Sequence, residues 1–182
     1  MIIYFVGIGC VGKTTIGRML ATKIGYSFFD VDEEVERYYQ KPIERIQDEC
    51  YSMNGFREKA SVVLDNILSN NDNTVISGTP SGLKFSFLQV FKRHQKKKEI
   101  ISIHLKDTPE NILERLTFFD KDSNPIHENL DESKKKRYLR EITADYNYFK
   151  DSYERADLLI DINDISLNSI PNLIIKRLAE II

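Results

Sequence analysis

Apolar residues follow two alternating patterns along the chain, and these patterns predict strands and helices in turn. Ile2–Val6 is apolar at every position, as is typical of a strand buried on both faces. Residues 14–24 instead carry apolar side chains at helical spacing, and Gly25 follows as a stop signal. The two patterns repeat to the end of the chain.

The other elements are predicted from the same periodicities and from the turn residues between them. Further strands are expected at residues 27–29, 74–77, 100–105 and 158–162. Further helices are expected at residues 33–39, 43–50, 55–68, 83–93, 108–118, 132–150 and 169–182. Residues 119–130 carry Asp, Asn, Pro and His without periodicity, which predicts a mobile loop.

Alternating strands and helices indicate an α/β fold of three layers. Parallel strands need crossover connections, and the helices that make these crossovers cover both faces of the sheet. In such folds, ligands bind at the carboxyl ends of the strands. The 182 residues, 41% of them hydrophobic, suit a single domain.

Charge and cysteine content exclude several classes of protein. The net charge of -2 gives no overall basic field, so we expect no nucleic-acid partner. The two cysteines, Cys10 and Cys50, provide neither a disulfide framework nor a metal site. No apolar run reaches the roughly 18 residues of a membrane span, and the first strand lacks a basic segment before it. We therefore expect a cytoplasmic protein without a membrane partner.

Residues 7–14 read GIGCVGKT and match the phosphate-loop pattern G-x-x-x-x-G-K-[ST] in full. Glycines let the backbone wrap around phosphates, and the helix that follows directs its positive dipole end toward them. Lys13 is expected to reach the β- and γ-phosphates of ATP, and Thr14 to offer its hydroxyl to Mg²⁺. The residues predicted to bind the nucleotide here are Gly7, Gly9, Cys10, Val11, Gly12, Lys13, Thr14 and Thr15.

Cys10 within this loop has two interpretations. It is a small residue that fills space, or it is a redox-sensitive thiol whose pKa is lowered by the helix dipole and by Lys13.

Three segments resemble the shikimate kinase family. Residues 12–21 (GKTTIGRMLA) are similar to its first helix, residues 29–36 (FDVDEEVE) to its D-x-D segment, and residues 55–58 (GFRE) to its G-F-R motif. The resemblance implies a P-loop fold like that of nucleoside monophosphate kinases, with a five-stranded parallel sheet. It also implies one kinase domain over residues 1–182, with a substrate-binding helical segment at about 32–70 and a lid at about 119–131.

The resemblance also implies roles for individual residues. Asp30 would help to hold Mg²⁺, Asp32 would orient the acceptor hydroxyl or accept its proton, and Arg57 would pair with an anionic group of the acceptor. The alternatives are that Asp30 and Asp32 cap the helix beginning near residue 33, and that Arg57 pairs with a glutamate.

Gly78, Thr79 and Arg115 complete the expected site. Gly78 and Thr79 fall where the family binds substrate, and Arg115 falls where it has an arginine near the adenine. Arg115 could instead be an ordinary residue on a helix surface.

The chain departs from the family pattern at three positions. The triple-glycine loop after the third strand is replaced by GTPSG at residues 78–82, where Pro80 has no N–H, although Thr79 and Ser81 offer hydroxyls. The arginine of the lid falls at Asn124, which leaves Lys121 as the cation of that loop. The arginine of the helix after the lid falls near Phe149.

The sequence therefore predicts phosphoryl transfer from ATP, with Mg²⁺, to a hydroxyl of a small anionic metabolite. Shikimate is the first candidate, and a monomer is expected. The alternatives are a kinase for a different acceptor, such as a sugar acid, nucleoside or nucleotide, and a nucleotide-binding homologue without catalytic activity.

Overall fold

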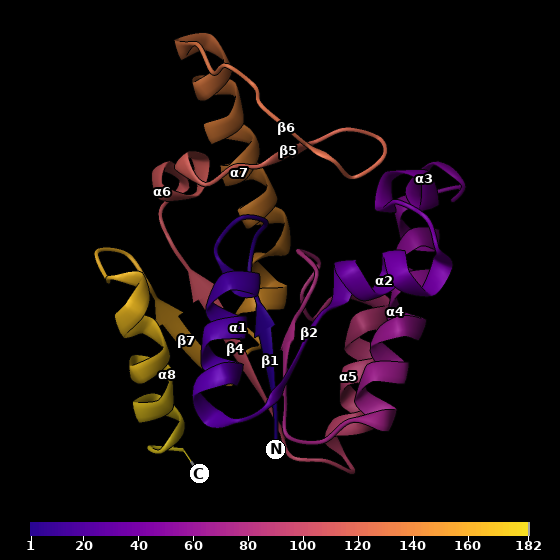
Figure 1. Cartoon of the computed structure of the whole chain (residues 1–182), viewed down its shortest axis with the longest axis vertical. Helices are drawn as coiled ribbons and strands as arrows, with labels where there is room; N and C mark the ends of the chain where they lie inside the picture. Colours follow the sequence, from indigo (N-terminus) through magenta and orange to yellow (C-terminus); the bar gives the residue numbers. More distant parts are fainter. Residues whose placement is uncertain (182) are drawn as a thin grey trace.

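Five parallel strands form one sheet in the order β2-β3-β1-β4-β7 (Figure 1). A computed structural model describes residues 1–181 of the chain. The strands are β1 (Ile2–Val6), β2 (Ser27–Asp30), β3 (Thr74–Ser77), β4 (Ile100–Lys106) and β7 (Leu158–Asp161). In the centre of the sheet, Ile2 of β1 lies beside Thr74 of β3 on one side and Ile100 of β4 on the other. The five-stranded parallel sheet implied by the sequence is confirmed.

Helices connect these strands, and each predicted helix is present, although several bounds differ. The helices are α1 (Lys13–Ile24), α2 (Val31–Tyr39), α3 (Ile43–Asp48), α4 (Met53–Asn70), α5 (Phe85–Gln95), α6 (Pro109–Glu114), α7 (Glu132–Tyr153) and α8 (Ile170–Leu178), with a 3-10 turn at Leu167–Ser169. The last predicted helix therefore ends earlier than expected, and its predicted last residue, Ile182, lies outside the described residues. No described helix is long and apolar enough to cross a membrane.

The central strand explains the three layers. Tyr4 and Val6 of β1 pack into a core formed with α4 and α5, whereas Ile3 and Phe5 pack into a second core with α1 and α8. Successive side chains of a strand point to opposite faces, so an apolar run of this kind needs a cover on both sides. Figure 1 shows α1 and α8 on one side of the sheet and α4 and α5 on the other.

Two predicted boundaries were wrong in ways that affect the site. Helix α2 begins at Val31 rather than near residue 33, because Asp30 caps it by accepting hydrogen bonds from the backbone N–H groups of Asp32 and Glu33 at 3.0 and 3.5 Å. Helix α6 ends at Glu114, four residues earlier than predicted.

The predicted loop after α6 contains a small hairpin. Strands β5 (Phe118–Phe119) and β6 (Pro125–Ile126) pair in an antiparallel manner, and the hairpin extends above the sheet (Figure 1). Strands of two residues have too few positions to show a periodicity in sequence.

Candidate functional site

The phosphate loop connects β1 to α1 and has the backbone that its glycines were expected to provide. Gly7 has a φ of 147°, and a Cβ there would lie 2.6 Å from the carbonyl oxygen of Leu105 on β4. Gly12, with a φ of 107°, lies directly before the first residue of α1. The loop therefore wraps closely against the sheet and leads directly into the positive end of a helix.

Lys13 is folded over this loop. Its ammonium group donates hydrogen bonds of 2.8 Å to the backbone carbonyls of Gly7 and Ile8, and the residue is buried. Burial lowers the pKa of Lys13, while the nearby Asp32 and Asp30 act in the opposite direction. The lysine thus lies within the curve of the loop, where a bound phosphate would supply the opposite charge.

Thr14 joins the phosphate loop to the end of β2. Its hydroxyl donates a hydrogen bond of 2.6 Å to Oδ2 of Asp30 and lies 3.5 Å from the hydroxyl of Ser77 at the end of β3. The other carboxylate oxygen of Asp30 caps α2. Asp30 therefore does cap a helix, as one alternative proposed, while its second oxygen faces Thr14.

Asp32 lies in the first turn of α2, close to this pair. Burial, followed by the charge of Asp30, raises the pKa of Asp32 to about 7, although Lys13 opposes the shift. A carboxyl group with a pKa near 7 is suited to take up a proton from an acceptor hydroxyl. The second alternative, that Asp32 caps α2, is wrong because Asp30 is the capping residue.

Arg57 is buried on α4 without an acidic partner among the described residues. Its Nε donates to the hydroxyl of Ser81 at 3.1 Å, and its Nη1 donates to the side-chain oxygen of Asn54 at 3.0 Å. Among the described residues Arg57 forms no ion pair with a glutamate, so that alternative is wrong. A buried guanidinium with neutral partners only is well suited to bind an anion.

The loop of residues 78–84 is fixed by the carboxyl end of α7. Tyr153 and Ser152 donate side-chain hydrogen bonds to the carbonyls of Pro80 and Ser81, at 2.6 and 3.0 Å, and Arg155 donates to that of Leu83 at 3.2 Å. The sequence did not predict these hydrogen bonds. The donors lie about 70 residues away from the loop, and only the fold brings them together.

Gly78 and Thr79 begin this loop, directly after β3. A Cβ on Gly78 would lie 2.6 Å from the hydroxyl oxygen of Tyr4 and 2.7 Å from the carbonyl oxygen of Phe5, so no larger residue fits. The hydroxyl of Thr79 is buried and has no partner among the described residues. The predicted contact of Thr79 with the substrate stays a prediction. The hydroxyl of Ser81 instead accepts from Arg57.

Arg115 follows α6 and is bonded within its own segment. Its guanidinium forms an ion pair with the buried carboxylate of Asp107 at the end of β4, which also accepts a hydrogen bond from Asn111. These bonds fix the connection from β4 to the hairpin of β5 and β6. The predicted contact of Arg115 with adenine stays a prediction.

The hairpin of β5 and β6, within the segment predicted to be a lid, contacts two helices that follow β2. Asp122 forms an ion pair with Arg45 of α3, and Ser123 donates a hydrogen bond to Glu36 of α2. Asn124, at the position of the family arginine, is bonded to Asp120 within the turn. Lys121 is exposed.

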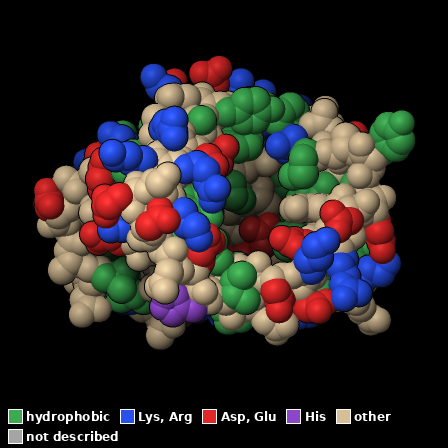
Figure 2. Space-filling view, turned by 90° about the horizontal axis from the view of Figure 1, so that it is seen from above, with side chains coloured by type: hydrophobic (Ala, Val, Ile, Leu, Met, Phe, Trp, Pro, Cys, Tyr) green, Lys and Arg blue, Asp and Glu red, His purple; other side chains and the backbone are tan. Residues whose placement is uncertain are grey.

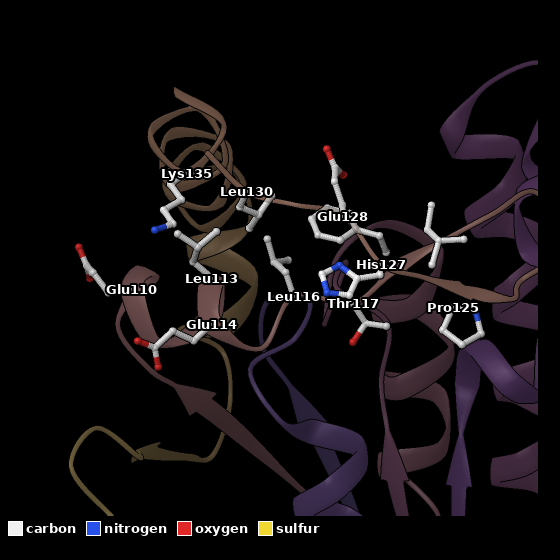
Figure 3. Close-up of a pocket in the computed structure, with 12 residues that line it drawn as sticks. Glu110, Leu113, Glu114, Leu116, Thr117, Pro125, His127, Glu128, Leu130 and Lys135 are labelled. Atoms are coloured by element: carbon white, nitrogen blue, oxygen red, sulfur yellow. The ribbon is translucent and has the colours of Figure 1, made fainter. Parts of the chain in front are cut away.

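One cavity lies beside the hairpin of β5 and β6, and no residue of the phosphate loop lines it. It measures about 710 Å³ and is formed by α6, the hairpin and the start of α7. Figure 3 shows Leu113, Leu116 and Leu130 around it, with Glu110 and Glu114 at one side. None of the predicted site residues lines it, so we assign the chemistry to the phosphate loop and its neighbours.

The phosphate loop, Asp30 and Gly78 lie at the carboxyl ends of β1, β2 and β3, whereas Arg115 lies beyond the end of β4. Figure 2 shows this end of the molecule from above, with a hollow at its centre and acidic side chains on the floor of the hollow. A phosphate loop on a five-stranded parallel sheet, with a buried lysine and a threonine–aspartate pair, defines a P-loop nucleotide-binding protein.

Comparison with known proteins narrows this class to one family. The profile of the family described as shikimate kinase matches residues 9–178, so the chain belongs to the shikimate kinase family. A shikimate kinase from Persephonella marina is 30% identical over 97% of this chain and 98% of its own length. The family and these relatives identify the protein as a small-molecule kinase that uses ATP.

Solved structures agree with this assignment. The shikimate kinase from Acinetobacter baumannii, solved in complex with shikimate, has a TM-score of 0.74 at 25% identity, over 98% of this chain and 93% of that one. The shikimate kinase from Bacteroides thetaiotaomicron has a TM-score of 0.77 at 19% identity, over 99% and 98% of the two chains. The latter comparison supports the fold.

Proposed function

We propose that this protein transfers the γ-phosphoryl group of ATP to a hydroxyl of shikimate. The observation that carries the proposal is the buried Asp32 carboxyl group, whose pKa is influenced by the charges of Lys13 and Asp30 on the phosphate side. Lys13 and Thr14 form the phosphate side, and the buried Arg57, without an acidic partner among the described residues, forms the anion-binding side. The resolved complex of a relative with shikimate supports this acceptor.

Asp32 and Lys13 have distinct tasks in this mechanism. Asp32 orients the acceptor hydroxyl and takes up its proton as the new oxygen–phosphorus bond forms and the bond from the γ-phosphorus to the bridging oxygen of ADP breaks. The raised pKa of Asp32 favours that proton transfer. The ammonium group of Lys13 and the N–H groups of the phosphate loop stabilise the charge on the phosphoryl oxygens. Arg57 binds the acceptor carboxylate and so fixes which hydroxyl faces the nucleotide.

A magnesium ion fits the oxygen atoms beside the phosphate loop. Among residues 1–181 there is no cluster of three metal-binding side chains. However, Mg²⁺ bound with a nucleotide keeps several waters and needs only one or two protein ligands. The adjacent oxygens of Thr14 and Asp30 are such ligands, with Asp30 acting directly or through water. When bound, the ion neutralises phosphate charge.

We also propose that residues 1–182 act as one kinase domain, in which 32–70 bind the acceptor and 119–131 form the lid. The bonds from the lid to Glu36 and Arg45 support this division, because they connect the two segments across the site. A monomer in the cytoplasm is the proposed form. The site uses residues of a single chain, and both cysteines are free, as is usual in reducing compartments.

An assay of ADP release with Mg²⁺, ATP and shikimate tests the proposal. We expect turnover that depends on shikimate and that falls at least about a hundredfold in Lys13→Ala. Lys23→Ala, an exposed change on the same helix, serves as the control and should leave turnover unchanged. Binding of ATP without turnover of shikimate would contradict the proposed acceptor.

A further inference from the structure

Two basic side chains, Arg57 and Lys84, contact the same two aromatic rings beside the loop of residues 78–84. The guanidinium of Arg57 lies 4.7 Å from the ring centroid of Phe85 and 6.0 Å from that of Phe149. The ammonium group of Lys84 lies 5.2 and 5.6 Å from the same two centroids. Both cations therefore lie near the ring of Phe85, and the distance between them cannot exceed the sum of their distances to its centroid.

Neither cation has an acidic partner in the described part of the chain. Arg57 donates only to Ser81 and Asn54, and its Nη2 makes no hydrogen bond to a described residue. Lys84 donates to the backbone carbonyl of Tyr148 at 2.9 Å and lies 4.0 Å from the centroid of the Tyr148 ring. Two like charges with neutral partners repel each other, and an anion between them would remove that repulsion.

The backbone holds Lys84 at this position. Phe85, the next residue, has a φ of 55°, which is uncommon for a bulky side chain and is a form of strain that gathers at functional sites. Arg155 bonds to the carbonyl of Leu83, the residue before Lys84. The lysine is thus fixed to α7 on one side and to the start of α5 on the other, while Phe85 remains partly exposed.

We infer that Lys84 is a second cation for the carboxylate of the acceptor, on the outer side of Arg57. Arg57 binds the carboxylate from the buried side, where Ser81 and Asn54 fix its guanidinium group through hydrogen bonds. Lys84 binds it from the solvent side, and both cations lie against the rings of Phe85 and Phe149. The inference rests on the proposed function and adds a residue that determines specificity for a carboxylate.

Steady-state kinetics with shikimate and with its methyl ester test the role of Lys84. We expect Lys84→Gln to raise KM for shikimate at least about fivefold, because one contact to a charged group is lost. The kcat and the KM for ATP should stay within about twofold, and Lys84→Arg should restore most of the affinity. With the uncharged ester as substrate, Lys84→Gln should have the same KM as the unchanged protein.

A matched control and two outcomes decide the inference. Lys92→Gln removes an exposed lysine from α5 and should leave each constant unchanged. The role of Lys84 is overturned if Lys84→Gln leaves the KM for shikimate unchanged, or if it raises the KM for the ester by the same factor. Turnover of shikimate in that case leaves the proposed function intact. If calorimetry detects no binding of shikimate to the unchanged protein, the proposed function and this inference both fail.

Discussion

The hydroxyl of Thr14 donates a hydrogen bond of 2.6 Å to the carboxylate of Asp30, and this bond joins the start of α1 to the end of β2. Two oxygen ligands are thereby placed side by side next to the phosphate loop. Since Asp30 also caps α2 with its other oxygen, the same carboxylate fixes the helix that carries Asp32. The phosphate side and the acceptor side of the site are thus coupled through one residue.

Removal of the Thr14 hydroxyl tests the proposed magnesium ligand. We expect Thr14→Val to raise the Mg²⁺ concentration that gives half-maximal activity by about tenfold, because one oxygen near the ion is lost. Thr14→Ser should retain the normal requirement. Thr22→Val serves as the control, since that hydroxyl bonds only to the backbone of Arg18 on the exposed side of α1. Equal Mg²⁺ requirements in Thr14→Val and Thr22→Val would rule out the assignment.

Substitution of Asp32 separates chemistry from nucleotide binding. Asp32→Asn keeps the size of the side chain but cannot accept the proton of the acceptor, so kcat should fall by about a hundredfold or more. The dissociation constant for ATP, measured by calorimetry, should change by less than about threefold. A loss of similar size in both quantities would show that Asp32 has a structural role.

Arg57 is predicted to matter for affinity far more than for stability. Because it is buried without an acidic partner among the described residues, Arg57→Met removes a costly buried charge, and thermal unfolding should shift by only a few degrees. The KM for shikimate should rise by about tenfold to a hundredfold. Arg93→Met, which breaks an exposed ion pair with Asp65, is the control and should leave this KM unchanged.

The lid is predicted to open in the absence of ligands. Its tip is attached through an exposed ion pair between Arg45 and Asp122, which contributes about 1 kcal/mol at most, and through Ser123 to Glu36. Amide hydrogen exchange at residues 119–131 should be fast in the free protein and slow with nucleotide and shikimate together. Exchange as slow as that of β4 in the free protein would argue against a lid.

His104 is predicted to make the fold sensitive to acid. Burial lowers the pKa of His104 from 6.5 to about 4, and its Nε2 has no hydrogen-bond partner among the described residues. The unfolded chain therefore binds a proton near pH 6.5, whereas the folded chain does so only near pH 4. Stability from this group is complete above pH 6.5 and is lost as the pH falls toward 4, by up to about 3 kcal/mol.

Denaturant unfolding at pH 7 and pH 5 measures this effect. In His104→Phe the aromatic contacts with Tyr146 and Tyr153 can be kept, so the variant should lose less stability than the unchanged protein between the two pH values. His127→Asn, an exposed change in the lid, should show the same loss as the unchanged protein. Parallel losses in all three proteins would refute a role for His104.

Local sequence was sufficient for the phosphate side of the site. The loop of residues 7–14 takes its shape from glycines, which adopt backbone angles that other residues rarely adopt. The flanking strand and helix follow from the spacing of apolar residues. The bounds of β1 and β3 were predicted to the residue, as was the end of α1. Errors occurred where a side chain decides the boundary, as Asp30 does for α2.

The acceptor side could not be predicted in the same way. Lys84 is followed by an ordinary aromatic residue in the sequence, and nothing in its neighbourhood indicates that it lies close to Arg57, 27 residues earlier in the chain. Pro80 was expected to remove a backbone donor from the loop, but the sequence did not show that the carbonyl of Pro80 accepts a hydrogen bond from Tyr153. Both relationships involve α7, which carries Tyr148 beside Lys84 and Tyr153 beside Pro80.

The sequence by itself determined the parallel sheet, the phosphate loop and the carboxylates beside it, because each depends on residues that are close in the chain. The tertiary structure decided which charges remain without partners, and hence where an anion can bind. Arg57 lies in α4, Lys84 is the residue that precedes α5, and Phe149 lies in α7. Their proximity is set by long-range packing, which local periodicity does not encode.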